Sequence, residues 1–251
     1  MGVAHIVKGK SVSTLQNVLI RVCMFKDWYK LIFPFNKMFT GIQKLTLRNG
    51  KSVFVRDIHS IDMTTVRHIL WDDEYKLEKL SLPKNAVVFD IGANIGTFCI
   101  GIRHICPTAQ ITAYEPNPNN FRMLRMNAPF AALLQKAATG KTGTVYIEDN
   151  RNFVGLEVTG QGGIPVESLS LDDILRDVQN VDLLKIDIEG SEYDLLNASS
   201  SQTFSKIQRI VMELHIVPDF DDAAWGESLL KKHGFVTSWL GQSVIYGEKP
   251  S

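Results

Sequence analysis

A glycine-containing turn that follows a short apolar strand constrains the fold of this chain more than any other feature. Residues 87–89 have the apolar character of a buried strand, and the segment Asp90-Ile-Gly-Ala-Asn-Ile-Gly96 then leads into a helical pattern. Gly92 and Gly96 lack a Cβ, so the turn can be tight and its backbone can lie close to a ligand. In open α/β sheets, ligands bind beyond the carboxyl ends of the strands. We therefore expect a ligand-binding crevice at residues 90–96.

The apolar pattern on both sides of this turn alternates between strands and helices. Such alternation predicts an α/β fold of the Rossmann-like class, with a mostly parallel sheet, right-handed crossovers and helices on both faces. An edge hairpin is expected near residues 145–147. The expected strands are 87–89, 111–114, 131–138, 183–188, 210–214, 235–239 and 243–246, and the expected helices are 97–105, 119–127, 171–178, 193–198 and 224–233.

The residues before this pattern form an N-terminal extension. Residues 14–33 carry an apolar stripe at helical spacing, and Pro34 should end that helix. Residues 42–58 predict a hairpin around the turn dipeptide Asn49-Gly50, followed by short helices to Leu70 and from Tyr75 to Leu80. We divide the chain into a basic amphipathic segment (1–41), a hairpin with helices leading into the core (42–83) and the α/β domain (84–251).

Charge is balanced over the whole chain but not along it. The 27 Lys and Arg residues equal the 27 Asp and Glu residues, which makes binding to nucleic acid unlikely, because such binding needs excess positive charge. Residues 1–40 carry six Lys and Arg against one acid, Asp27. The predicted basic helix has three interpretations: packing on the main domain, contact with a membrane surface, or binding of a partner.

The crevice residues favour one nucleoside cofactor over another. A dinucleotide fingerprint that starts at Gly92 would need glycines where the chain has Asn94 and Thr97. Asp90 would repel a pyrophosphate but suits a cation, such as the amino group of a methionine moiety. Glu115 ends the next strand, where a carboxylate can accept hydrogen bonds from two ribose hydroxyls. These residues predict S-adenosylmethionine.

A second set of polar residues ends the next two strands. Asp187 and Glu189 end the strand at 183–188, and Glu213 and His215 end the strand at 210–214. If these strands are neighbours, the four side chains converge beside the cofactor, and we expect them to be catalytic. His215 is the first candidate for a general base because histidine titrates near neutrality, and Asp187 is the second.

Other interpretations of these residues stay open. The four side chains could bind a divalent metal, although no metal is expected. Glu189 and Glu192 could instead form salt bridges or cap a helix, and His215 could be a hydrogen-bonded residue at a strand end.

Four motifs follow the strands of the predicted sheet: Val88-Phe-Asp-Ile-Gly-Ala-Asn-Ile-Gly96, Ala113-Tyr-Glu-Pro116, Leu184-Lys-Ile-Asp-Ile-Glu-Gly190 with Glu192, and Met212-Glu-Leu-His215. Through these motifs the chain resembles the FkbM family of S-adenosylmethionine-dependent methyltransferases over roughly residues 45–247. The resemblance implies a seven-stranded sheet with one antiparallel strand near an edge. It also implies cofactor contacts from Asp90, Gly92, Ala93, Asn94, Gly96, Glu115 and, ahead of the first strand, Tyr75.

We therefore expect O-methyl transfer to a hydroxyl of a small metabolite or glycan. The alternatives are a non-catalytic module that binds S-adenosylmethionine, and an N-methyltransferase. The N-methyltransferase is disfavoured because the strand at 183–188 is followed by Glu189-Gly190 rather than by a Pro-Pro-aromatic turn. Three cysteines without a CxxC pair, no signal-peptide layout and no apolar run of roughly 18 residues predict a cytoplasmic protein. Peripheral membrane contact through residues 1–41 stays open as one of the three interpretations of the basic helix.

Overall fold

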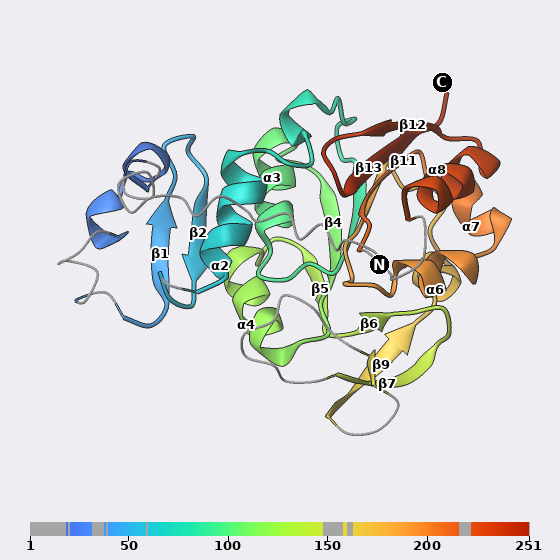
Figure 1. The fold of residues 1–251 in the computed structure, drawn as a ribbon, viewed down its shortest axis with the longest axis horizontal. Helices are drawn as coiled ribbons and strands as arrows, with labels where there is room; N and C mark the ends of the chain where they lie inside the picture. Colours follow the sequence, from blue (N-terminus) through green and yellow to red (C-terminus); the bar gives the residue numbers. More distant parts are fainter. Residues whose placement is uncertain are drawn as a thin grey trace, which may run out of the picture.

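The central element of the fold is a seven-stranded sheet (Figure 1). The computed structural model describes residues 19, 21–31, 38, 40–58, 60–147, 158–159, 163–215 and 222–250. The strand order is β12-β13-β11-β10-β3-β4-β5, and β13 runs antiparallel to both of its neighbours. This confirms the Rossmann-like α/β class. The strands are β3 (Val87–Ile91), β4 (Gln110–Tyr114), β5 (Ala132–Leu134), β10 (Leu183–Ile186), β11 (Arg209–Glu213), β12 (Val236–Trp239) and β13 (Val244–Glu248).

Alternating side chains of the sheet build two separate apolar layers. Val88 of β3 and Leu183 of β10 face one layer, whereas Phe89 and Leu184 face the other. Burial on both faces is typical of parallel strands. Helices α3 (Thr97–Ile105) and α4 (Pro118–Asn127) cover the first face. Helices α5 (Leu171–Ile174), α6 (Glu192–Asn197), α7 (Ser201–Ser205) and α8 (Asp222–Lys232) cover the second.

The strand order reverses at β3. From β3 the chain proceeds to β4 and β5 on one side and later returns to β10, which pairs with the other side of β3. The connections that leave β3 and β10 therefore diverge and open a crevice between the carboxyl ends of the two strands. The turn at residues 90–96 lies there, as the sequence predicts.

A second, four-stranded sheet was not predicted as such. It consists of β6 (Ala137–Ala138), β7 (Gly143–Ile147), β8 (Val158–Thr159) and β9 (Ile164–Leu169), in the order β6-β9-β7-β8. The single strand expected at 131–138 is wrong, because Gln135 and Lys136 interrupt it and its halves, β5 and β6, belong to different sheets. The helix expected at 171–178 ends at Ile174.

The N-terminal hairpin is present but the helix before it is not continuous. β1 (Gln43–Thr46) and β2 (Ser52–Val55) pair antiparallel around the predicted turn. Residues 21–24 are helical, but Phe25 forms a β-bridge with Leu47 and a 3-10 helix, η1, covers Trp28–Leu31. The prediction of one helix over 14–33 is therefore wrong within the described residues, because backbone pairing with β1 and complete burial of Phe25 override the helical spacing.

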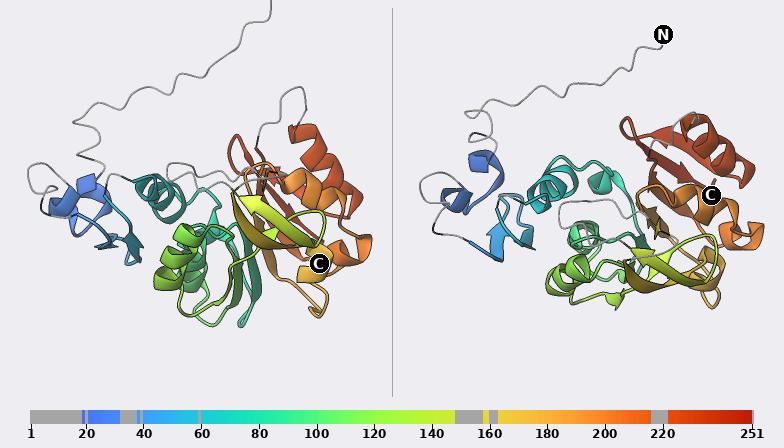
Figure 2. Two further views of the ribbon diagram at one scale, coloured as in Figure 1. Left: turned by 90° about the horizontal axis from the view of Figure 1, so that it is seen from below. Right: turned by 60° about the horizontal axis from the view of Figure 1, so that its bottom comes forward.

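Short helical segments connect the hairpin to the core. Helix α2 (Asp62–Thr65) continues into a π-helical segment, η3 (Val66–Trp71), and a 3-10 helix, η4 (Leu77–Lys79), follows. The hairpin lies at one end of the molecule and the C-terminal strands lie at the other (Figures 1 and 2). No helix in the described part of the chain is long and apolar enough to span a membrane.

One buried amide joins the hairpin to the core. Asn127, at the end of α4, accepts the backbone N–H of Phe54 at 2.7 Å and donates to the Phe54 carbonyl at 2.9 Å. Its Nδ2 also donates to the carbonyl of Ile95, in the turn before α3, at 2.7 Å. Asn127 thus fixes the hairpin against the turn of the crevice.

Replacing this amide by an apolar side chain of similar size should destabilise the protein. We expect Asn127→Leu to lower the free energy of unfolding by about 2–3 kcal/mol, because it leaves buried backbone groups without partners. Urea unfolding followed by circular dichroism measures this change. The exposed control Gln135→Ala should change it by less than about 0.5 kcal/mol. Equal stability of both variants would contradict the role of Asn127.

Candidate functional site

The turn after β3 is held between β4 and β10. The backbone N–H groups of Gly92 and Ala93 both donate to the carbonyl of Tyr114, at 3.0 and 2.9 Å. Gly92 has a φ of +80°, and a Cβ at this position would lie 1.8 Å from the carbonyl oxygen of Asp187. Only glycine fits here. The backbones of the turn and of the end of β10 are therefore in direct contact.

Two residues of the motif lie behind the crevice rather than in it. Gly96 has a φ of +89°, and a Cβ there would lie 2.9 Å from Leu124 of α4. Asp90 is fully buried, and its carboxylate contacts Lys185 and the thiol of Cys99. The structure therefore does not favour the expected contact between Asp90 and the amino group of the cofactor. The carboxylate of Asp90 is already paired with Lys185 inside the core.

Lys185 of β10 is the cation that pairs with Asp90. Its ammonium lies 3.2 Å from Asp90 Oδ1 and 3.4 Å from Asp187 Oδ2, and it donates to the carbonyl of Gly92 at 2.6 Å. Burial opposes the charge, but the two carboxylates outweigh it and raise the pKa of Lys185 above its ordinary value. Lys185 thus links the turn after β3 to the end of β10 through a permanent positive charge.

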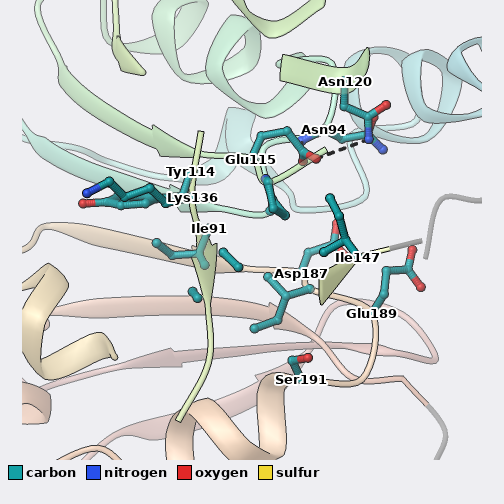
Figure 3. Close-up of a pocket in the computed structure, with 15 residues that line it drawn as sticks. Ile91, Asn94, Tyr114, Glu115, Asn120, Lys136, Ile147, Asp187, Glu189 and Ser191 are labelled. Atoms are coloured by element: carbon teal, nitrogen blue, oxygen red, sulfur yellow. Dashed lines mark hydrogen bonds between the residues drawn. The ribbon is translucent and has the colours of Figure 1, made fainter. Parts of the chain in front are cut away.

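The first pocket lies between the ends of β3, β4 and β10 (Figure 3). Glu115 and Asn120 lie on one side, and Asp187, Glu189 and Ser191 lie on the other. The space between the lining residues, open solvent at its mouth included, is about 610 Å³. The apolar part of the lining consists of Ile91, Tyr114, Pro116, Ala137, Ala138, Ile147 and Ile188.

Glu115 supplies a buried carboxylate to the first pocket. One oxygen accepts the backbone N–H of Asn94 at 2.8 Å, and the other accepts the N–H of Asn117 at 2.9 Å and the side chain of Asn120 at 3.4 Å. Burial raises the pKa of Glu115 to about 7, although these hydrogen bonds oppose the change. A carboxylate has about four lone-pair positions, so Glu115 can still accept from a ligand hydroxyl.

The second pocket lies between the α2–η3 segment and the ends of β10 and β11. Its space is about 730 Å³. The two pockets share Gly92, Asn94, Asp187 and Glu189, so they meet at the point where the turn touches the end of β10. Further lining residues of the second pocket are Ile61, Thr64, Thr65, His68, Ile69, Glu74, Tyr75, Ala93, Thr97, Phe98, Lys185, Glu213 and His215.

The four polar residues at the strand ends do converge, because β10 and β11 are parallel neighbours. His215 Nε2 lies 3.1 Å from Glu189 and 3.9 Å from Asp187, and its Nδ1 lies 2.9 Å from Glu192. The fully buried Glu192 also accepts the backbone N–H groups of Ile188 and Gly190. Glu192 therefore fixes both the loop after β10 and the imidazole.

The protonation of His215 differs from the sequence-based expectation. Burial lowers its pKa, but hydrogen bonds to Glu189 and Glu192 outweigh that effect and raise the pKa to about 11. The imidazole is then a cation at neutral pH, with both ring N–H groups donating. This state weighs against His215 as a general base.

Glu213 is a better placed proton acceptor. It lines the second pocket and accepts the hydroxyl of Ser243 at 3.2 Å. Burial, together with the charge of Asp187, raises the pKa of Glu213 to about 7. Asp187 in turn accepts the hydroxyl of the buried Tyr75 at 3.2 Å.

Three of these residues could also hold a metal ion. Asp187, Glu213 and His215 each offer a ligand atom, and these atoms lie within 4.8 Å of one another. Both ring nitrogens of His215, however, already contact carboxylates. A metal would have to displace the contact with Glu189, and the arrangement therefore does not favour one.

Sequence reasoning assigned no role to several residues of the site. Lys185 was the most visible of these, since it is a charged residue inside the apolar run of β10. Asn120, Ile147, His68 and Glu74 line the pockets from elements distant in sequence, and no local pattern marks them.

The arrangement has counterparts among known proteins. The family model described as "Methyltransferase FkbM domain" matches residues 90–244. The 31-O-demethyl-FK506 methyltransferase FkbM of Streptomyces tacrolimicus is 30% identical, over 77% of this chain and 89% of the relative. The hexuronic acid methyltransferase AglP of Haloferax volcanii is 27% identical, over 54% and 59%. The AMB antimetabolite synthetase AmbE of Pseudomonas aeruginosa is 27% identical over 72% of this chain, which spans 11% of that protein.

Removing the buried cation should destabilise the protein strongly. We expect Lys185→Met to lower the free energy of unfolding by about 3–5 kcal/mol, because the carboxylate of Asp90 is then buried without its partner. Urea unfolding at neutral pH measures this loss. The double variant Lys185→Met/Asp90→Asn should recover part of it. If the double variant is no more stable than Lys185→Met, the ion pair is not the cause.

Proposed function

The chain belongs to the FkbM methyltransferase family, and we propose that it transfers a methyl group from S-adenosylmethionine to a hydroxyl of an uncharged metabolite or glycan. The observation that carries the proposal is the meeting of two pockets at Gly92, Asn94, Asp187 and Glu189. One pocket can hold the donor and the other the acceptor. Methyl transfer needs the two ligands in contact and in line.

The first pocket fits the nucleoside part of the donor. Glu115 has one lone-pair position left for a ribose hydroxyl, and Tyr114 and Ile147 offer apolar surface to the adenine ring. The carboxylates of Asp187 and Glu189 face the shared region, where they suit the positive sulfonium and would repel a pyrophosphate. S-adenosylmethionine supplies an electrophilic methyl group when it is bound.

In the second pocket, Glu213 accepts the proton that the acceptor hydroxyl loses. A pKa of about 7 is suitable for this task, because general-base catalysis is most efficient when the pKa of the base lies near the working pH. Asp187, held by Tyr75 and Lys185, orients the hydroxyl. The charged His215 keeps Glu189 in place and is a positioning residue.

The charges of the second pocket predict an uncharged acceptor. Its lining contains the acids Glu74, Asp187, Glu189 and Glu213. Each basic residue of the lining is paired with a carboxylate: His68 with Glu74 at 3.7 Å, and Lys185 and His215 as described above. Among the described residues, no cation remains to neutralise an anionic acceptor. We therefore expect this protein to act poorly on hexuronic acids, although the relative AglP is named a hexuronic acid methyltransferase.

Two measurements test this function. Calorimetry should detect binding of S-adenosylmethionine but not of NAD, and Glu115→Ala should weaken it at least tenfold, about 1.4 kcal/mol. Transfer of labelled methyl groups is then measured on matched pairs of neutral hexosides and hexuronides. The label should appear as an O-methyl ether on the neutral member. Binding of NAD alone would exclude the donor assignment. Preferred labelling of the hexuronide, or of an amine, would exclude the acceptor assignment.

The proton-acceptor role of Glu213 predicts a pH dependence. Only the ionised carboxylate can accept a proton, so kcat should rise with pH and level off above about 7. Glu213→Gln should lower kcat about 100-fold or more and abolish this rise. Assays run with a chelator should give the same profile, since no metal is expected. The matched control Glu227→Gln, on α8, should keep the wild-type profile. A rise that persists in Glu213→Gln would assign the proton transfer to another group.

A further inference from the structure

The outer face of the N-terminal hairpin carries exposed positive charge. Leu45 and Leu47 of the first strand region are buried, so alternation places Ile42, Lys44 and Arg48 on the opposite face, and all three are exposed. On the neighbouring strand, Phe54 is paired with Lys44, whose ammonium lies 5.8 Å from the Phe54 ring centre. These side chains therefore form one surface.

The segment before the hairpin extends this surface. The backbone N–H of Lys26 donates to Thr46 of β1 at 2.8 Å, which places the exposed Lys26 next to the same face. Lys30 reaches the carbonyl of Lys44 at 3.4 Å. Lys26, Lys30, Lys44 and Arg48 thus gather around β1, and Asp27 is the only acid within residues 21–31 and 40–56.

Exposed apolar side chains concentrate in the same stretch of the sequence. Nine large hydrophobic residues are exposed in the described part of the chain, and five of them lie between residues 19 and 42. Trp28 and Tyr29 of η1 are among these five, and so is Ile42. The other four, Ile61, Phe130, Tyr146 and Val236, lie in four separate parts of the chain. We call Lys26, Trp28, Ile42, Lys44 and Arg48 the basic-aromatic surface.

We propose that the basic-aromatic surface binds peripherally to the surface of a bilayer that contains anionic lipids. Lysine and arginine are attracted to anionic headgroups over distances of a Debye length. Tryptophan is favoured at the level of the headgroups because its ring is both apolar and polar. Ile42 gains free energy when it leaves water for the acyl boundary. The combination matches a membrane surface in charge and in polarity.

A nucleic acid would satisfy only part of this surface. Phosphates would attract the same cations, but the backbone offers no apolar environment to Ile42. The chain as a whole has no net charge, whereas binding to a polyanion depends on a net positive field. The membrane is therefore the partner that uses all five residues.

Docking through this surface leaves the reaction site open. None of its five residues lines either pocket, and the hairpin lies at one end of the molecule (Figure 2). The enzyme can therefore bind a bilayer and its ligands at the same time.

Co-sedimentation of the full chain with vesicles tests the proposal. The protein should pellet with vesicles of phosphatidylcholine and phosphatidylglycerol, should pellet much less with phosphatidylcholine alone, and should be released by raised salt. The variant Lys26→Gln/Lys44→Gln/Arg48→Gln should bind at least about tenfold more weakly. The matched control Lys84→Gln/Arg176→Gln/Lys232→Gln removes three charges from other elements and should bind like the wild type.

Two further readouts separate a surface contact from general attraction of charge. Tryptophan emission should shift to shorter wavelength on addition of anionic vesicles, and Trp28→Phe should abolish the shift. Unfolding curves should show that each variant remains folded. Equal binding of the two triple variants, equal binding to neutral and anionic vesicles, or release of the protein by equimolar single-stranded RNA at low salt would overturn the proposal.

Discussion

The arrangement of the site depends on the contacts of one buried group, the ammonium of Lys185. It places one positive charge between Asp90, Asp187 and the carbonyl of Gly92, and thereby joins two loops that belong to different crossovers of the sheet. A buried carboxylate such as Asp90 is stable only beside a partner of opposite charge. Asp187 is more exposed, and the same cation fixes its position. The core and the reaction site are thus stabilised by one residue.

Acidic side chains predominate at the carboxyl ends of β10 and β11. Asp187, Glu189, Glu192 and Glu213 gather around His215, and the imidazole remains charged because two carboxylates accept its protons. The loop after β10 is fixed by Glu192 through hydrogen bonds from two of its backbone N–H groups. Such a preorganised acidic environment favours a donor with positive charge at the reacting centre.

Local patterns in the sequence were sufficient for most of the seven-stranded sheet and for the convergence of polar side chains at the ends of β10 and β11. The alternation of apolar runs located six of the seven strands within a few residues, whereas the strand expected at 131–138 spans two strands of different sheets. Asp187, Glu189, Glu213 and His215 were singled out because they lie at the ends of buried strands. Non-local pairing was not predictable in the same way. The four-stranded sheet of β6, β7, β8 and β9 depends on contacts between short segments. The helix expected over residues 14–33 is interrupted because the backbone of Phe25 pairs with that of Leu47. The burial of Asp90 and the charge of His215 likewise follow from neighbours that only the folded chain brings together.

The contact between Gly92 and the carbonyl of Asp187 lies where the two pockets meet, so a change of the backbone there would reach both of them. The two pockets have four lining residues in common. Residues of α2 and η3 line only the second pocket, and residues of β4, β6 and β7 line only the first. Substitutions at Thr64, Thr65 or His68 therefore change the shape of the second pocket without altering a residue that lines the first. Under the proposed division of the two pockets, the acceptor preference can be redesigned at these positions while the donor pocket stays unchanged.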